Sequence, residues 1–234
     1  MAYQVFNDVV FTGNIDRIKA AIGDERNAID FEKLIPMPKE LSVIENGHAA
    51  EAVSAYLSAV NPENEAVIYE KYRINDYNAL YDELSTSFVA LKDDLKSVDF
   101  RNVLFGKRYA NNVRKYGYIT WYDWRIAMWG TNKAAFEAAW DGSTLTFSTV
   151  ENCCEPIIQK IALMFPEAEI KYCWVSEEPG ALYGEATMKG KKIKRKELPG
   201  YSKEAFEAFA KYFEVDLADY GYVYDITRGT YIIP

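Results

Sequence analysis

The stretch Glu169-Ile-Lys-Tyr-Cys-Trp-Val-Ser-Glu-Glu-Pro-Gly180 decides the fold class of this chain. Its first seven residues alternate between polar and apolar side chains, as a half-buried strand does, and Glu178-Pro-Gly180 then provides a turn. A second turn at Lys189-Gly190 separates two further strand-like runs, residues 181–188 and 191–196. Strands joined by such tight turns pair antiparallel. The sequence therefore predicts an antiparallel sheet, which places the chain in the α+β class.

The succession of strands and helices continues on both sides of this stretch. Before it the predicted elements are strands at residues 5–12 and 145–150 and helices at 15–22 and 156–165; after it come a helix at 202–213 and a hairpin at 222–226 and 230–233. Residues 29–38 end in two prolines and are predicted to form an extended edge segment. This order is close to the split β-α-β arrangement. We expect a ferredoxin-like antiparallel sheet with helices on one face, interrupted by a helical insertion.

The insertion is indicated by a change of period between about residues 46 and 115. Apolar side chains there recur every three or four residues, as in Leu80, Leu84, Phe88, Leu91 and Leu95. We therefore predict three organisational parts: a ferredoxin-like core at residues 1–44 and 118–200, a helical insertion at 45–117, and a C-terminal extension of one helix and one hairpin at 201–234.

Composition and charge indicate a packed globular protein. Of 234 residues 49% are hydrophobic, and 35 Asp and Glu against 27 Lys and Arg give a net charge of −8. Residues 1–100 contain 18 acidic and 9 basic side chains, so the acidic excess falls within the first hundred residues. No run reaches the ~18 apolar residues of a membrane span, and the first residues lack the basic region of a signal peptide. Three cysteines make no disulfide framework, so we expect a cytoplasmic protein without a membrane partner.

The residue types that the commonest catalytic schemes need are scarce. His48 is the single histidine, expected at an exposed helix start, so Ser-His-Asp and Cys-His schemes lack support. Adjacent Cys153 and Cys154 with distant Cys173 do not have the spacing of zinc ligands. The glycines around Gly184 do not form a phosphate loop, because Lys189 stands where the second glycine belongs. We predict no catalytic residue, metal site or cofactor, although dispersed carboxylates can still meet in space.

Three further segments carry a family resemblance: Val9-Val-Phe-Thr-Gly13, Asp30-Phe-Glu-Lys-Leu-Ile-Pro-Met-Pro38 and Trp121-Tyr-Asp-Trp-Arg-Ile-Ala-Met-Trp-Gly-Thr131. Together they resemble the YubB-type ferredoxin-like domain family. The resemblance covers the first forty residues and about residues 118–190, and the tryptophan-rich segment is its most specific part. It implies a ferredoxin-like fold and a cytosolic phage or plasmid accessory protein of unknown function. It carries over no catalytic residues.

The tryptophan-rich segment has two interpretations. As a helix it would place Trp121, Trp124, Arg125 and Met128 on one face. Aromatic residues at helical spacing are mostly buried, which favours a core or a domain junction. The alternative is an exposed aromatic platform that stacks a base or anchors a partner. Its candidate binding residues are Trp121, Tyr122, Trp124, Arg125 and Trp129.

The basic run Lys189-Gly-Lys-Lys-Ile-Lys-Arg-Lys196 has three interpretations. On a strand, Lys192, Lys194 and Lys196 would face one side, and Lys191, Ile193 and Arg195 the other. The lysines would protect an edge strand from aggregation, pair with the acidic insertion, or bind nucleic acid. The candidate binding residues are Lys191, Lys192, Lys194, Arg195 and Lys196.

These observations leave several classes of function open. The leading hypothesis is a non-enzymatic accessory protein of a phage or mobile element that binds a host or phage protein through the helical insertion. One alternative is a nucleic-acid-binding protein that uses the basic hairpin at residues 189–196. Another is an enzyme with carboxylate or tyrosine chemistry in a cleft between the core and the insertion. A structural role in an assembly is the remaining class.

Overall fold

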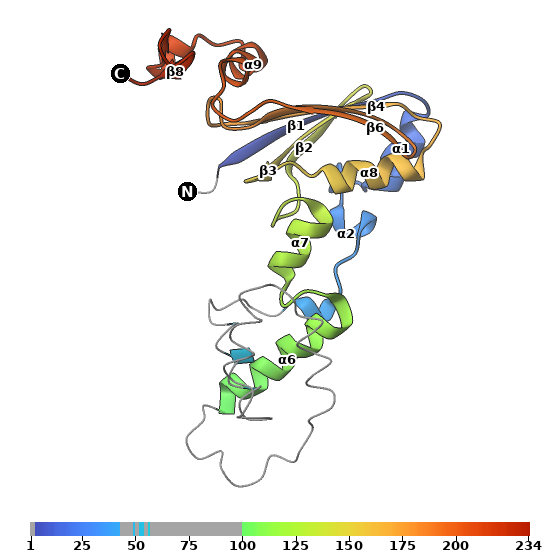
Figure 1. The fold of residues 1–234 in the computed structure, drawn as a ribbon. Coiled ribbons are helices and arrows are strands. Elements are labelled where there is room, and N and C mark those ends of the chain that lie inside the picture. The colour runs from blue at the N-terminus through green and yellow to red at the C-terminus, as the bar shows by residue number, and fades with distance from the viewer. Residues whose placement is uncertain (1–2, 43–48, 50–51, 54–55, 57–99) are drawn as a thin grey trace. The chain divides into compact units, whose positions relative to one another are not determined.

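The computed structural model describes residues 3–42, 49, 52–53, 56 and 100–234 (Figure 1). The chain divides into two compact units, one formed by Met1–Pro36 with Arg125–Pro234 and the other by Met37–Trp124. The first unit contains every strand of the described residues. The helical run predicted over residues 80–95 lies outside the described residues.

The first unit is built on a six-stranded antiparallel sheet with the strand order β2-β3-β1-β4-β5-β6. The strands are β1 Gln4–Phe11, β2 Phe136–Asp141, β3 Thr144–Val150, β4 Ile170–Ser176, β5 Tyr183–Lys189 and β6 Lys192–Glu197. Helix α1 (Ile15–Ile22) follows β1, and helix α8 (Glu155–Met164) joins β3 to β4. The first four strands with these two helices make a β-α-β-β-α-β unit, which is the ferredoxin-like arrangement. The predicted α+β fold is confirmed.

Alternation along the strands determines what lies beneath the two helices. In β1, Val5, Asn7, Val9 and Phe11 are buried while their neighbours are half-buried or exposed. Tyr172 lies opposite Val9 in β4 and therefore points to the same face. Figure 1 shows α1 and α8 covering this face of the sheet. The apolar side of α8, from Ile157 to Ala162, completes the core there.

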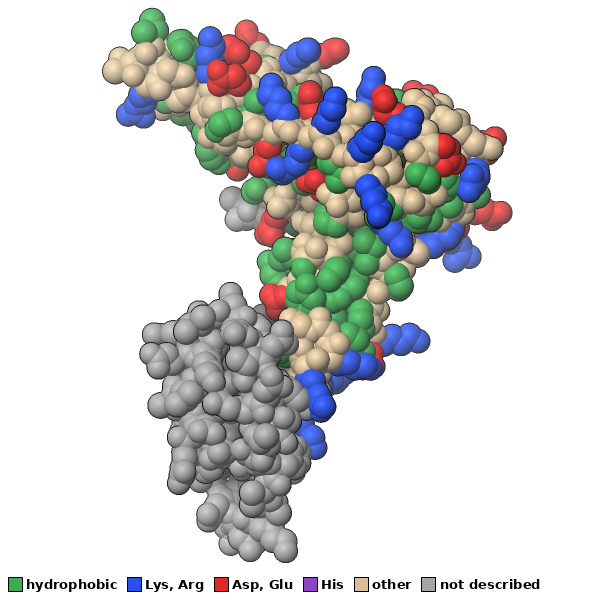
Figure 2. Space-filling model, turned by 45° about the vertical axis from the view of Figure 1, so that its right-hand side comes forward, with side chains coloured by type: hydrophobic (Ala, Val, Ile, Leu, Met, Phe, Trp, Pro, Cys, Tyr) green, Lys and Arg blue, Asp and Glu red, His purple; other side chains and the backbone are tan. Residues whose placement is uncertain are grey.

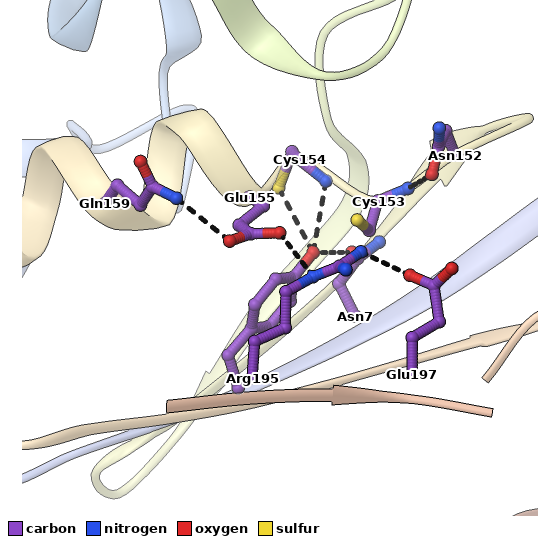
Figure 3. Close-up of polar contacts among 9 residues, drawn as sticks. Asn7, Asn152, Cys153, Cys154, Glu155, Gln159, Arg195 and Glu197 are labelled. Carbon is purple, nitrogen blue, oxygen red and sulfur yellow. Dashed lines mark hydrogen bonds and ion pairs between the residues drawn. The ribbon is translucent and has the colours of Figure 1, made fainter. Parts of the chain in front are cut away.

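A buried polar network joins this covered face to the start of α8 (Figure 3). The Tyr172 hydroxyl donates to Asn7 Oδ1 at 2.7 Å and accepts from the Cys154 backbone N–H at 3.1 Å. Asn7 Nδ2 donates to Thr149 Oγ1 at 3.0 Å and to the Val5 carbonyl at 2.8 Å. Burial raises the pKa of Tyr172 and of Cys154, so both stay neutral. Cys154 is the N-cap of α8 without a side-chain cap bond, so the tyrosine hydroxyl satisfies a donor at the helix start.

The C-terminal extension packs on the opposite face of the sheet. Helix α9 (Lys203–Phe213) places Phe206 and Phe209 against Val175 of β4, and the Phe6 ring meets Phe213 edge-on at 5.2 Å. The short hairpin β7 (Val223–Asp225) and β8 (Thr230–Ile232) then closes over Phe206. Figure 1 shows α9 over one end of the sheet only. We call this partly covered side the open face.

The second unit is described mainly through helix α6 (Phe100–Tyr116). Asn112 Nδ2 donates to the carbonyls of Glu40 at 3.1 Å and Ile119 at 3.0 Å, which ties the helix to the chain on both sides of it. Lys115 and the Glu40 carboxylate form an exposed ion pair at 2.8 Å. Helix α7 (Trp121–Trp129) begins in this unit and ends in the first.

Two secondary-structure predictions were wrong. Strand β2 was not expected, because Phe136–Asp141 contains two adjacent alanines and a register shift after Phe136 interrupts its alternation. Residues 29–38 are not one extended segment. Asp30 caps the four-residue helix α2 (Phe31–Leu34) through bonds to the N–H groups of Glu32 and Lys33, and a 3₁₀ turn at Lys39–Leu41 follows.

The Tyr172→Phe substitution tests the buried network. It would leave Asn7 Oδ1 and the Cys154 N–H without their partner in a dry environment, so we expect the free energy of unfolding to fall by about 1–3 kcal/mol. The matched control is Tyr220→Phe, since Tyr220 is 47% exposed and its hydroxyl can be hydrated. Urea unfolding of the two variants measures the difference. Equal midpoints would show that the network does not stabilise the fold.

Candidate functional site

The lysines of the basic run gather on the open face together with lysines from other strands. Residue pairing sets Lys194 opposite Thr187, and Thr187 opposite Lys171, so these three share one row across β6, β5 and β4. Lys192 and Lys196 share the face of Lys194, as the predicted alternation requires. Lys189 lies opposite Lys192. We define the lysine face as Lys171, Lys189, Lys192, Lys194 and Lys196, all of which are exposed.

The lysine face is electrostatically unbalanced. In the part of the chain that the structure describes, no ion pair involves any of its five lysines. Lys189 and Lys192 face each other directly, and like charges in that position destabilise a sheet. Figure 2 shows Lys and Arg side chains gathered over the part of the molecule that carries the sheet. The face therefore presents positive charge to solvent at some cost in folding free energy.

Arg195 lies on the opposite side of β6 and has a structural role (Figure 3). Its Nε is 2.8 Å from Glu155 Oε2 at the start of α8, and it also pairs with Glu197. The guanidinium carbon lies 5.4 Å from the centre of the buried Trp174 ring. Arg195 thus fastens the edge strand to α8. Lys191, the other cation predicted for this side, lies in the exposed turn after Gly190.

Cys173 and Glu185 continue the cross-strand row of Lys196 toward the rest of the open face. Cys173 lies opposite Glu185, and Glu185 accepts a 2.6 Å bond from the Tyr183 hydroxyl. Burial raises the pKa of Cys173 and that of Cys153 to about 11, and it raises the pKa of Cys154 well above its usual value. All three cysteines of the chain are therefore protonated at neutral pH, a poor state for a nucleophile.

The tryptophan-rich segment is helical. Trp124 and Trp129 are 6% and 0% exposed, which agrees with the favoured interpretation of a core and not with the alternative of an exposed platform. Trp129 Nε1 donates to the Ile35 carbonyl at 2.9 Å, and its ring packs edge-on against Phe31. Arg125 lies over the Trp129 ring and 3.6 Å from Glu32. Trp121 and Tyr122 are half-buried and pack against each other.

Other kinds of site find no support among the described residues. No group of three or more His, Cys, Asp or Glu side chains there could hold a metal ion. No described helix has the length and apolar character needed to cross a membrane.

The sequence did not indicate Lys171 as part of the lysine face. Lys189 belongs to the predicted basic hairpin, but it is the last residue of β5 and not part of the turn. Lys171 is 21 positions from Lys192, and strand pairing alone brings it close. The sequence does indicate where Lys171 points. Lys171 stands between apolar Ile170 and Tyr172 in an alternating strand, so its side chain must face away from the core.

No family model matches the chain, and no curated protein matches it. Among solved structures, the chain is similar to the crystal structure of a protein api92 from Yersinia pseudotuberculosis, assigned to the family model DUF1281. The two share 10% sequence identity with a TM-score of 0.37, over 86% of this chain and 99% of the other. A likeness at this TM-score carries no argument about fold or function. Membership in the YubB-type family therefore stays a prediction.

Arg195→Gln and Lys194→Gln separate the structural side of β6 from its solvent side. Arg195→Gln removes the pair with Glu155, whose side chain is 18% exposed, and the contact with Trp174, so we expect a loss of roughly 1 kcal/mol in the free energy of unfolding. Lys194→Gln removes no ion pair and should change it by less than about 0.5 kcal/mol. Thermal unfolding of both variants is the measurement. An equal or larger effect of Lys194→Gln would contradict the assignment of the two sides.

Proposed function

We propose that this protein binds nucleic acid through the lysine face. The observation that supports this best is that five exposed lysines from three neighbouring strands point to one side of the sheet without an ion pair among the described residues. Phosphate groups are the partners that such a surface attracts, because each lysine that neutralises a phosphate releases condensed counterions. The sheet supplies a rigid support that fixes the spacing of the charges.

Protection of the edge strand does not account for the whole surface. Lysines on an edge strand do discourage pairing with another chain, and that role fits Lys192, Lys194 and Lys196 on β6. Lys171 belongs to β4, which is hydrogen-bonded on both sides, to β1 and to β5. A lysine there protects no edge. Its place in one row with Lys194 favours a binding role over protection alone.

The charge of the whole unit limits how such binding would work. Residues 1–36 and 125–234 contain 22 Asp and Glu against 17 Lys and Arg, so the unit is net negative. Attraction then comes from the local face, within a screening length of about 8 Å at physiological salt. Binding would be short-ranged and strongly salt-dependent, without a general affinity of the protein for polyanions.

The proposal is one version of the non-enzymatic accessory protein that is the leading hypothesis from the sequence. A phage or plasmid setting, and a host or phage protein as partner of the helical insertion, stay predictions, because residues 57–99 lie outside the described part of the chain. The catalytic alternative has no comparable support, since the thiols are protonated and the tyrosines of the open face have raised pKa values.

The triple substitution of Lys192, Lys194 and Lys196 to Gln tests the proposal. It removes three cations without adding acidic groups, so we expect binding of a fluorescent 12-nucleotide single strand to weaken roughly 10–100-fold at low salt. The slope of log affinity against log salt should fall by about 2, since each contact to a single strand contributes roughly 0.7. Fluorescence anisotropy at several salt concentrations measures both.

The control is the triple variant Lys133→Gln, Lys160→Gln and Lys211→Gln, which makes the same charge change at exposed positions off the lysine face. It should keep both the affinity and the slope. If the wild type binds neither the single strand nor a duplex of the same sequence at low salt, the proposal fails. Equal losses in the two triple variants would show that net charge, and not this face, governs binding.

A further inference from the structure

A pocket of about 250 Å³ opens on the same open face, on the other side of Cys173 from the lysine face. Its lining includes Phe6, Asp8, Glu137, Thr146, Ser148 and Tyr212. The volume equals about eight water molecules at ~30 Å³ each. It is smaller than the roughly 300–1,000 Å³ of pockets that hold drug-sized ligands. The pocket therefore has room for one small group.

Three parts of the fold form the pocket. Phe6 lies opposite Ser148, and Asp8 opposite Thr146, so the ladder between β1 and β3 forms the floor. The register shift in β2 is a β-bulge, and Glu137 within it has a φ of 52°. Bulges change the direction in which a side chain points, and this one brings Glu137 to the rim. Tyr212 of α9 supplies a further wall.

The polar groups of the pocket are mainly hydrogen-bond acceptors. Asp8 is half-buried and accepts a bond from the Tyr212 hydroxyl, which leaves most of its lone pairs unused. Burial raises the pKa of Asp8, and the bond from Tyr212 opposes that shift. Gln4 Nε2 donates to Glu137 Oε2 at 3.1 Å and to Ser148 Oγ at 2.7 Å, which holds both groups in place. A ligand that fits must bring N–H donors to these oxygens.

The pocket and the lysine face lie within reach of one bound strand. Asp8, Cys173, Glu185 and Lys196 form a single cross-strand row. Three strand spacings separate the backbones of Asp8 and Lys196, which is about 14 Å. A short oligonucleotide whose phosphates contact the lysines can therefore direct a base toward Asp8.

We propose that this pocket takes one unpaired guanine base of the bound strand, with its N1–H and N2–H groups donating to the Asp8 carboxylate and its ring beside Phe6. The inference rests on the proposed function and names a specificity within it. Guanine offers two adjacent N–H donors on its Watson–Crick edge, which match the two oxygens of one carboxylate. Thymine offers one N–H between two carbonyl oxygens, and those oxygens would face Asp8 and Glu137 unfavourably.

The test compares three 12-nucleotide strands on the full chain: all thymine, one central guanine in thymine, and one central inosine in thymine. A matched bidentate contact discriminates by about tenfold or more, so we expect the guanine strand to bind at least tenfold more tightly than the thymine strand. Inosine lacks the 2-amino group and should lose most of that preference. Equal binding of all three strands by the wild type overturns the inference and leaves the proposed function standing.

The Asp8→Asn variant should abolish the guanine preference, so that the ratio of guanine-strand to thymine-strand affinity falls to about one. The control is Asp16→Asn, an exposed carboxylate on α1 with the same charge change, which should keep the preference. Persistence of the preference in folded Asp8→Asn protein contradicts the inference. If Asp8→Asn does not fold, the inosine comparison on the wild type decides.

Titration with mononucleotides distinguishes a failure of the guanine pocket from a failure of nucleic-acid binding by the lysine face. Guanosine and thymidine 5′-monophosphate are titrated into the wild type, and NMR chemical shifts report binding. Shifts confined to the pocket and specific to the guanosine nucleotide, together with no oligonucleotide binding, would uphold the pocket and reject the lysine face. The absence of any response to the guanosine nucleotide at millimolar concentration, combined with base-independent binding of strands, would reject the pocket alone.

Discussion

The two-sided pairing of β1 is the constraint on which the rest of the structure depends. β1 is hydrogen-bonded to β3 on one side and to β4 on the other, both antiparallel. Its alternation then assigns Asn7 and its partners to the helix-covered face and Asp8 and its partners to the open face. A slip of one residue would exchange these sets and bury Asp8 under α8. The buried hydrogen bond between Tyr172 and Asn7 stabilises the observed register of β1 against β4, because it forms only when these two residues lie close on the covered face.

The polar groups on the two faces of the sheet differ in whether they have partners within the protein. On the covered face, the Tyr172 hydroxyl forms hydrogen bonds with Asn7 and with the start of α8. Arg195 forms an ion pair with Glu155 on the same side. On the open face, α9 covers Phe6 and Val175, and beyond them the lysines have no ionic partner among the described residues. Polar groups that the fold satisfies internally stabilise it, whereas unpaired charges on a rigid surface are available to a ligand. This contrast locates the candidate function on the open face.

Much of the fold could be predicted from the sequence, because tight turns and period-two alternation act locally. The antiparallel sheet, α1 behind its Asn14 cap and the lysine alternation on β6 follow from such signals. Strand β2 could not be predicted, because the bulge at Glu137 interrupts the two-residue alternation by which a strand is recognised. The burial of Trp129 depends on its bond to the Ile35 carbonyl, 94 positions away.

The candidate site was only partly predictable for a related reason. Its edge-strand lysines are neighbours in sequence, so their common face was visible in the pattern. Lys171 joins them through pairing across β5, and Asp8 meets Tyr212 across most of the length of the chain. Contacts of that kind arise from topology, which residue spacing does not encode.

Lysine acetylation footprinting with and without a bound single strand tests the central claim most directly. Each exposed lysine reports its own protection by mass spectrometry, with Lys133 and Lys160 as internal references outside the lysine face. Selective protection of the lysine face, Lys171, Lys189, Lys192, Lys194 and Lys196, is the predicted result. Protection that is absent from these five lysines, or that is equal at the reference lysines, would contradict the account.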